Sequence, residues 1–545
     1  MDRTSSTQTA RSRIAGAVDR LSAAFAARVA IDLRALAAFR IGLGAVLIAD
    51  LALRSRSLTA FYTDYGVLPR RALFSDYSAT QSLYGFVGEP WAVALLFAVA
   101  GAFALALAVG YRTRAVTVVS WVLLFSLHGR NPMVLNAGDS LLLMLLFWSA
   151  FLPLGARWSV DAARRADRSA DSEPEPNSAP AGVSDASIAT VATMAVLIQM
   201  LLMYVTNAVH KFESEQWMGG DAVAYITQAD QLTYLFGNYL AELHGLLRAF
   251  TVLWVVLLVA SPLLLLLTGF PRAVLGSLFV GMHLGMAVTI RVGLFPVVVV
   301  VGFLLFVQTP VWDAAERVVA SLDRSGSLAR WRARLESRAR SVPALGAWAP
   351  RWTASDRADG SDTSRLSAGL ARGQVLFTTV LPYAFLVLIV LSSASSVGYA
   401  DTPDPAEEVL DAVEMEQSWQ MFAPDPIDTT RWYVAAGTLE DGSERDLLHG
   451  SAADFERPSR VETTYPTARW RKYFANVYGA DNENHRSYLA NYLCSDWNRT
   501  HQTAVENVTV YQAYERTTPG NGTVEAAGEF ALIEYDCSGE FIQNE

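Results

Sequence analysis

Long apolar runs separated by short polar segments dominate the first 400 residues of the chain. A helix needs roughly 20 apolar residues to cross about 30 Å of hydrocarbon. Nine runs approach or reach that length, and we expect each to be a membrane-spanning helix: 35–53, 91–110, 115–128, 139–154, 188–208, 247–268, 273–289, 292–308 and 375–396. The third and fourth runs are short, so one or both could be re-entrant.

The pattern changes after residue 400, where short stretches of alternating polarity replace the long runs. WYVAAGTLEDGSERDLL predicts a strand, a turn at Asp441-Gly442 and a second strand. NVTVYQAYERTT and EFALIEYDC predict further strands, and RWRKYFANVYG and HRSYLANYLCSDW predict helices. The predicted fold class is therefore an all-α membrane bundle of about nine helices, followed by a small extracytoplasmic α+β domain.

Two polar segments interrupt the apolar pattern. Residues 161–187 have the Pro, Ser and Glu enrichment of a disordered loop, and residues 309–373 carry eleven arginines with no sustained aliphatic face. We divide the chain into an amphipathic N-terminal segment (1–34), a transmembrane module (35–308), an Arg-rich linker (309–373), a last transmembrane helix (374–397) and the α+β domain (401–545).

Composition and charge agree with a multi-pass protein of the cell membrane. Hydrophobic residues make up 52% of the chain, and the mean hydropathy is +0.24, more apolar than ordinary soluble proteins. The Arg-rich linker favours the cytoplasmic side, together with the N-terminus. The last 145 residues hold 27 acidic and 10 basic side chains, a net charge of −17. We expect this domain to lie outside.

The two cysteines and three glycosylation sequons all lie in that last domain. The sequons are at Asn498, Asn507 and Asn521, and they favour export of the domain. Cys494 and Cys537 can close one disulfide or remain free thiols. We found no zinc-ligand spacing, phosphate-binding loop or nucleophile elbow, and we expect neither a metal nor a nucleic acid as a ligand.

Lys211 is the most informative polar residue near the membrane. It lies in NAVHKFESEQW, directly after an uncharged apolar run, in a chain with only one other lysine, Lys472. A sheltered amine can act as a base near neutral pH, which a guanidinium cannot. Pairing with Glu213 or Glu215 would instead make Lys211 part of an ordinary interfacial salt bridge.

Other polar residues lie in or beside the apolar runs. Charged groups in such places usually face the bundle interior or a cavity. Most of these residues fall at the predicted outer ends, where they would form a polar chamber that a lipid-soluble ligand can reach, although outer ends are polar in any such protein. Arg40, near the inner end, and His283, in mid-membrane, also have structural explanations. The candidates are Arg40, His128, Arg130, Asn136, Asp139, His210, His283 and Arg291.

Five motifs, in matching order and spacing, resemble a known family. They are FRIGLGAVLIADLALRSRSLTAFYTDYGVLPRR, Tyr111-Arg112, Trp158-Ser159-Val160-Asp161, VHKFESEQW and HLGMAVTIRVGLFPVVVVVGFLLFVQTPVWD. Over residues 30 to 315 the chain resembles the horizontally transferred transmembrane (HTTM) domain, the membrane module of vitamin K-dependent gamma-carboxylase. That enzyme oxidises a reduced naphthoquinone with O2, which generates a base that removes a proton from a peptide glutamate before CO2 adds.

The resemblance implies roles for individual residues. The family segment contains two consecutive lysines. The second, which is the catalytic base, aligns with Lys211, and the first aligns with His210. This chain has one more residue than the family segment between Lys211 and Trp217. A family histidine falls near Asn136 and Asp139, where this chain has none. On this reading His210, Asn136 and Asp139 assist Lys211. Residues expected to contact a menaquinol-like reduced naphthoquinone are His283, Arg291, Arg40, His128 and Arg130.

Two functions from different classes follow. The first is a quinol- and O2-dependent carboxylase or oxygenase with Lys211 as base and an exported protein as a possible substrate. The second is a non-catalytic quinone- or lipid-binding or assembly protein whose outer domain binds an exported partner. EQSWQMFAPDPIDTTRWYVAAGTLEDGSERDLL resembles the C-terminal segment of prokaryotic members, so a glutamate-rich substrate is not implied. A transporter is less favoured, because no inverted repeat is visible.

Overall fold

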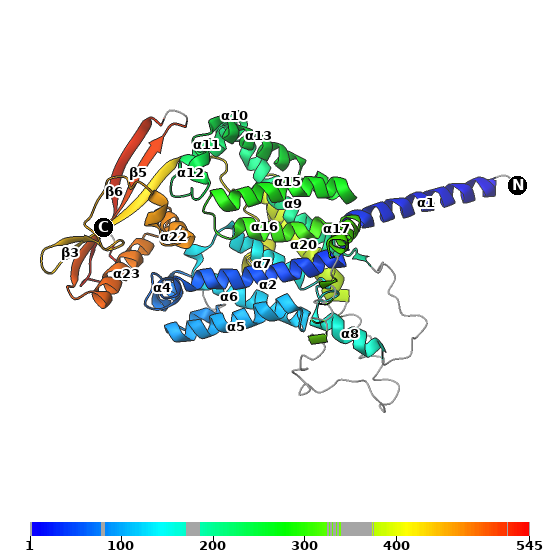
Figure 1. Ribbon diagram of the computed structural model, residues 1–545, viewed down its shortest axis with the longest axis horizontal. Helices are drawn as coiled ribbons and strands as arrows, with labels where there is room; N and C mark the ends of the chain where they lie inside the picture. Colours follow the sequence, from blue (N-terminus) through cyan, green and yellow to red (C-terminus); the bar gives the residue numbers. More distant parts are fainter. Residues whose placement is uncertain are drawn as a thin grey trace, which may run out of the picture.

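The computed structural model describes residues 3–77, 82–170, 186–323, 375–519 and 522–543, with isolated positions between 326 and 373. A helical bundle occupies the centre, helix α1 (Arg3–Val29) projects from one end and the C-terminal domain covers the other (Figure 1). The sequon at Asn521 and most of the Arg-rich linker lie outside the described residues, whereas Asn498 and Asn507 are exposed.

Five helices are long and apolar enough to cross a membrane, and the chain is accordingly a multi-pass membrane protein. A sixth candidate combines α16 (Phe295–Phe303), η4 (Leu304–Phe306) and α17 (Thr309–Leu322), which bend by 101° at a short break. The five are α2 (Leu33–Ser55), α5 (Pro90–Val109), α9 (Val191–Phe212), α15 (Gly269–Thr289) and the pair η5 (Leu376–Val380) with α20 (Leu381–Ser396).

The expectation of nine spans is not confirmed, and helix length and polarity explain the difference. Helix α7 (Ala137–Ser149) has 13 residues and α13 (His244–Ala260) has 17. At 1.5 Å per residue both are shorter than the hydrocarbon core. The break after α13 falls at Ser261-Pro262, where proline removes a helical hydrogen bond. Helix α6 (Thr113–Arg130) includes Arg114, His128 and Arg130, which lower its hydropathy.

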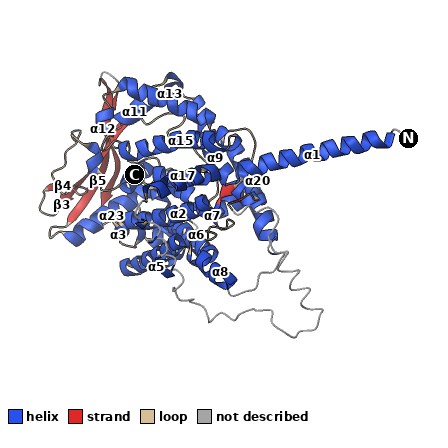
Figure 2. Ribbon diagram, turned by 45° about the vertical axis from the view of Figure 1, so that its right-hand side comes forward, coloured by secondary structure: helices blue, strands red, loops and turns tan. Residues whose placement is uncertain are grey.

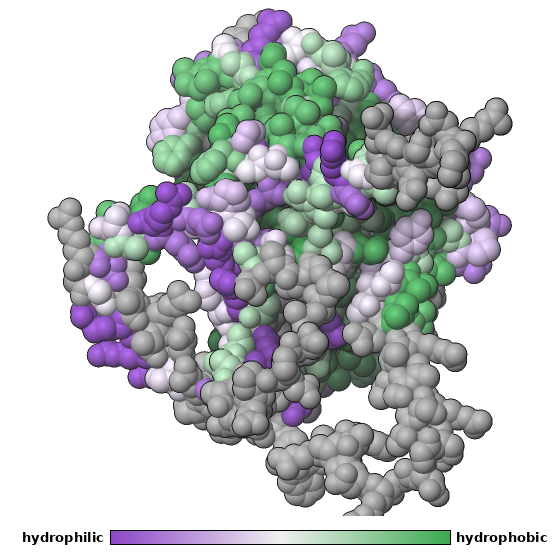
Figure 3. Space-filling model, turned by 90° about the vertical axis from the view of Figure 1, so that its right-hand side faces the viewer, coloured by the Kyte–Doolittle hydropathy of each residue, from purple (hydrophilic) through white to green (hydrophobic). Residues whose placement is uncertain are grey.

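Helix α7 is the centre of the bundle. Its residues from Leu141 to Leu146 are buried on every side, between α6, α9 and α16. Gly138 permits the close approach of its first turn to α16, since an added Cβ would lie 2.8 Å from Phe295 Cα. Helices α13 and α15 expose large apolar side chains on the outside of the bundle. Figure 3 shows a broad apolar patch in the upper part of the molecule, the part in which α13 and α15 lie in Figure 1.

Short elements complete the bundle. They include the two-stranded pair β1 (Ile31–Asp32) and β2 (Ser187–Ile188), whose Asp32 caps α2 by accepting from Arg34 N at 2.7 Å. The remaining short elements are α3 (Leu58–Tyr62), α4 (Arg70–Asp76), η2 (Leu83–Phe86), η3 (Pro132–Val134), α10 (Glu215–Gly219), α11 (Ala222–Gln228), α12 (Gly237–Leu240) and α14 (Leu263–Leu266).

The two polar segments contain helices that the sequence analysis did not predict. Residues 161–170, the start of the expected disordered loop, belong to helix α8 (Val160–Ala170), and residues 309–322 of the expected linker form α17. Asp161 explains the order of the first segment, because its carboxylate accepts from Arg112 N at 2.9 Å and Thr113 N at 2.8 Å. Arg34 similarly holds α17 through Asp313 and Glu316. The polar composition of these segments predicted disorder or a linker, because contacts with distant residues cannot be recognised from local composition.

The C-terminal domain is α+β, as predicted. A four-stranded antiparallel sheet has the order β4-β3-β5-β6 and carries two helices on one side (Figure 2). The turn at Asp441-Gly442 joins the first two strands, with Gly442 at a positive φ of 77°. The elements are α21 (Asp404–Ala412), β3 (Thr429–Leu439), β4 (Glu444–Asp446), η6 (Val461–Thr464), α22 (Ala468–Tyr478), α23 (Asn484–Thr500), β5 (Val505–Thr517) and β6 (Val524–Asp536).

This domain shares one hydrophobic core with the membrane module. The rings of Phe61, from α3, and Trp470, from α22, lie 4.6 Å apart within a buried cluster that contains residues of both parts. A disulfide between Cys494 and Cys537 joins α23 to the end of β6, with the Cα atoms 5.6 Å apart. The continuous core fixes the C-terminal domain against the end of the bundle.

Candidate functional site

Lys211 lies in the last turn of α9, where the helix meets the C-terminal domain. Its side chain is 2% exposed. Nζ donates to Met421 O at 2.8 Å and lies 3.3 Å from Phe422 O, and it sits 3.7 Å from the centre of the Trp217 ring. The amine is therefore enclosed by two backbone carbonyls and one aromatic face.

Lys211 has no acidic partner among the described residues. Glu213 and Glu215, which the sequence offered as partners, are exposed to solvent. Neither forms an ion pair with Lys211 in the part of the chain that the structure describes, so the salt-bridge alternative is not realised. A buried cation without a counter-charge is costly, and such groups are found at functional sites more often than elsewhere.

The chain segment from Gln417 to Phe422 closes the site from the side of the C-terminal domain. Asn207, one turn before Lys211, donates from Nδ2 to Trp419 O at 2.8 Å and to Met421 O at 3.2 Å. Trp217 donates from Nε1 to Phe422 O at 2.7 Å. Helices α9 and α10 thus hold this segment against Lys211 by its own backbone carbonyls.

A cavity of about 710 Å³ opens beside Lys211. Pockets for small molecules usually measure about 300–1,000 Å³ and are mostly apolar with few polar groups. Of the candidates from the sequence, Lys211, Asn136 and His283 line this cavity, and Arg471 and Lys472 of α22 line it as well. Its apolar wall includes Tyr204, Ile226, Leu247, Phe250, Trp254, Met282, Met286 and Phe295.

His283 forms part of the wall deep in the bundle. The side chain is fully buried, its Nδ1 lies 2.8 Å from Phe279 O, and its Nε2 is 3.5 Å from the hydroxyl of Tyr204. Its ring lies 5.4 Å from that of Trp254. The contact with Phe279 O places the proton on Nδ1, which leaves Nε2 as the acceptor.

Helix α22 contributes the two other basic residues of the cavity. Burial lowers the pKa of Arg471 to about 10, and the nearby Arg291 acts in the same direction. Burial, followed by the charge of Arg471, also lowers the pKa of Lys472. Both shifts have the same cause, since each cation is withdrawn from water without a carboxylate close enough to compensate.

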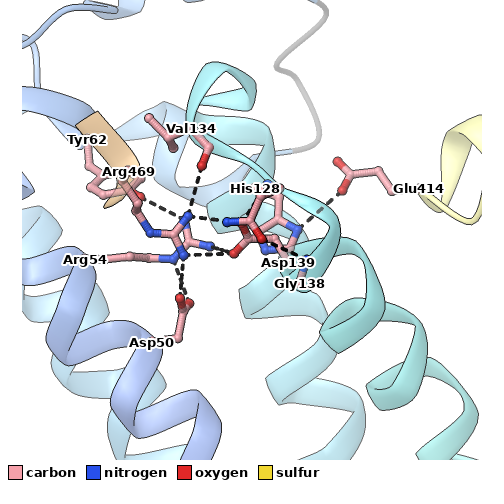
Figure 4. Close-up of polar contacts among 10 residues, drawn as sticks. Asp50, Arg54, Tyr62, His128, Val134, Gly138, Asp139, Glu414 and Arg469 are labelled. Atoms are coloured by element: carbon pink, nitrogen blue, oxygen red, sulfur yellow. Dashed lines mark hydrogen bonds and ion pairs between the residues drawn. The ribbon is translucent and has the colours of Figure 1, made fainter. Parts of the chain in front are cut away.

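Asp139 belongs to a different site, a buried charge cluster of Asp50, Arg54, Asp139 and Arg469 (Figure 4). Arg54 lies 2.6 Å from both carboxylates, and Arg469 lies 2.6 Å from Asp50 and 2.9 Å from Asp139. Burial lowers the pKa of Arg469, but Asp139 and Asp50 outweigh it and hold that pKa well above its usual range. Asp139 is also the third residue of α7, in a capping box with Asn136.

Two of the remaining candidates lie near the cavity without lining it. His210 is buried beside Lys211, and its Nε2 has no hydrogen-bond partner among the described atoms. Arg291 donates from Nη1 to Glu462 O at 2.5 Å and to Tyr465 O at 3.1 Å, and so anchors the C-terminal domain.

Three candidates lie away from the cavity. Arg40 donates to Leu154 O and Trp158 O at the opposite end of the bundle. Arg130 donates to Leu68 O at 2.8 Å, and His128 lies 3.6 Å from Glu414. The structure therefore does not bring Arg40, Arg130 or His128 to Lys211.

Sequence reasoning missed Asn207, Arg471, Lys472 and the segment that covers Lys211. The signals were present in part, since Asn207 opens the motif NAVHKFESEQW and Lys472 is the second of only two lysines. Their proximity depends on how the C-terminal domain docks, which no local pattern contains.

Comparison with known proteins gives one result. The HTTM domain model matches residues 29–312, more than half of the chain. Neither the curated proteins nor the solved structures contain a match. The matched range includes Lys211, His283 and the bundle half of the cavity, but not α22.

Proposed function

Because the chain belongs to the HTTM domain family, we propose that it is a membrane enzyme in which Lys211 acts as a general base beside a lipid-soluble reduced quinone. The observation that carries the proposal is a buried lysine, without a carboxylate partner among the described residues, on the wall of a largely apolar cavity. In the proposed orientation the N-terminus is cytoplasmic and the C-terminal domain extracytoplasmic. The acidity, disulfide and exposed sequons of that domain support this orientation.

The cavity fits a reduced naphthoquinone in size and character. Aromatic side chains of Tyr204, Trp254 and Phe295 can pack on a flat ring, and the aliphatic wall suits a hydrocarbon tail. Nε2 of His283 and the side chain of Asn136 are polar groups at the wall that can orient ring oxygens. When bound, such a quinol would supply the electrons that reduce O2.

The contacts of Lys211 suit a base. A neutral amine has two N–H groups and one lone pair. The carbonyls of Met421 and Phe422 are acceptors for two N–H groups, which would direct the lone pair of Nζ toward the cavity. Once Nζ has accepted a proton, the face of Trp217 stabilises the ammonium by a cation–π interaction. The segment from Gln417 to Phe422 keeps bulk water from Nζ during this transfer.

The test is epoxide formation from a reduced naphthoquinone under O2, in membranes that carry the full chain. Lys211→Arg should reduce the rate by about 100-fold or more, because a guanidinium keeps its proton at neutral pH. Glu213→Gln is the matched control, since Glu213 is exposed two residues away, and its rate should equal that of the wild type. An undiminished rate in Lys211→Arg would refute the role of Lys211.

A second function is favoured by one specific observation. Asp139 stands where the family enzyme has a histidine, and Arg54 and Arg469 occupy both of its oxygens. A carboxylate held in this way is not free to assist Lys211. The alternative is a quinone- or lipid-binding or assembly protein whose C-terminal domain engages an exported partner. Quinone binding by the wild type without epoxide formation would favour it.

A further inference from the structure

The C-terminal domain concentrates its few cations on the helix that faces the cavity. It has ten basic residues against 27 acidic ones, yet Arg469, Arg471 and Lys472 follow within four positions of α22. Arg469 is neutralised by the buried charge cluster. The other two are not explained by that cluster.

Arg471 and Lys472 have no ion pair in the part of the chain that the structure describes. Among the described residues, the side chain of Arg471 makes a hydrogen bond from Nη2 to Arg291 O at 3.4 Å. Its Nε is buried and has no partner among the described atoms. Lys472 is half-buried beside it. Donors withdrawn from water without acceptors are destabilising, and this indicates that an acceptor is supplied from outside the chain.

The charge of the cavity wall indicates the nature of that acceptor. Lys211, Arg471 and Lys472 line the cavity, whereas Asp425 is the one acidic residue among its described lining residues, and it is exposed. The remaining wall is largely apolar and aromatic. A ligand that satisfies both parts has a negative group at one end and a hydrocarbon portion at the other.

We propose that the cavity binds an amphiphile with an anionic headgroup, a carboxylate or a phosphate, with the headgroup held by Arg471 and Lys472. The apolar chain lies along Leu247, Phe250 and Met286, toward the lipid-facing helices α13 and α15. This inference depends on the proposed function only in using the same cavity. It adds a ligand of a different chemical class from a quinone, which carries no charge.

The test measures equilibrium binding to the full chain in detergent, with radiolabelled oleate, oleyl phosphate and oleyl alcohol as probes. The two anionic probes should bind about tenfold or more tightly than the alcohol, because charge-assisted hydrogen bonds form only with them. The double variant Arg471→Gln/Lys472→Gln should remove this preference and leave the alcohol unaffected. Arg499→Gln, on α23 and outside the cavity, is the control and should bind as the wild type does.

Each result has a defined meaning. Equal affinity for oleyl alcohol and oleate would overturn the anionic headgroup, and inorganic phosphate binding as tightly as oleyl phosphate would overturn the amphiphile. A preference that survives in the double variant would overturn the role of α22. The single variant Lys472→Gln, which should lose part of the preference, is available if the double variant does not fold. Binding needs no turnover, so this inference and the role of Lys211 can fail independently.

Discussion

The buried charge cluster and the cavity lie at the same junction between the bundle and the C-terminal domain, but they treat buried charge in opposite ways. In the cluster, two aspartates face two arginines, and the short contacts leave no space between them. In the cavity, Lys211, Arg471 and Lys472 line about 710 Å³ of space with one exposed aspartate among the described lining residues. The charges of the cluster balance one another, whereas the basic residues of the cavity have no matching number of carboxylates among the described lining residues.

The difference distinguishes charges that hold the fold together from charges that we propose bind a ligand. A buried ion pair contributes little net stability, but losing one partner is expensive because the other remains buried and unpaired. The cluster therefore fixes the position of α22 through Arg469. With that helix fixed, Arg471 and Lys472 are held at the cavity wall although no carboxylate compensates them. Balanced charge in one region thus maintains unbalanced charge in the other.

The largest expected effect on stability follows from breaking the balance of the cluster. Arg469→Met leaves Asp50 and Asp139 with Arg54 alone, and it should lower the free energy of unfolding by about 3–5 kcal/mol. Denaturant titration of the full chain in detergent measures this change. Arg499→Met, an exposed arginine of the same domain, should change it by less than about 1 kcal/mol.

A double variant sharpens the same point. Asp139→Asn combined with Arg469→Met removes one charge of each sign and restores the balance between Asp50 and Arg54. It should be more stable than Arg469→Met alone, although it carries one more substitution. If the two substitutions simply add, the cluster is not a coupled unit, and the contrast with the cavity would fail.

Lys211→Met should have a smaller effect on stability. It removes one donor from the carbonyls of Met421 and Phe422, which keep the hydrogen bonds from Asn207 and Trp217, and it leaves no charge unpaired. The cost should therefore be about 0.5–1.5 kcal/mol. The same titration should therefore rank this variant between the wild type and Arg469→Met. A loss as large as that of Arg469→Met would mean that Lys211 is as structural as the cluster, and would weaken the proposal that it is a base.

The sequence was sufficient to identify elements whose signal is local. Alternation, turn residues and helical periodicity after residue 400 predicted the strands, the turn at Asp441-Gly442 and the two long helices, and these predictions are confirmed. The apolar runs predicted a membrane bundle correctly. The predicted number of nine spans is not confirmed, because runs such as 139–154 form helices shorter than their apolar length.

A site residue could be predicted only where its residue type and its place next to an apolar run were both visible in one short segment of sequence. Lys211 was identifiable because lysine is rare in this chain and follows an apolar run. Asp139 was assigned beside it because the family resemblance places a histidine of the enzyme near this position, whereas the fold directs the carboxylate of Asp139 to Arg54 and Arg469. Arg471 could not be found, because its proximity to Lys211 depends on a docking contact between residues about 260 positions apart.

We expect the smallest effect on the free energy of unfolding from the pair of His449 and Asp446. Like the buried charge cluster, this pair joins a basic and an acidic side chain, but it is partly exposed. The hydrogen bond from His449 Nδ1 to Asp446 Oδ2, 2.5 Å long, raises the pKa of His449, although burial opposes it. A raised pKa in the folded state stabilises the protein below the pKa of an unfolded histidine, about 6.5, and this contribution is lost as the pH rises through the folded value. His449→Gln should thus cost about 0.2–1 kcal/mol near pH 5.5 and less near pH 8, measured by the same titration at both pH values. A cost that grows with pH would contradict this assignment. Because solvent screens the exposed pair, its cost should remain well below that of Arg469→Met at either pH.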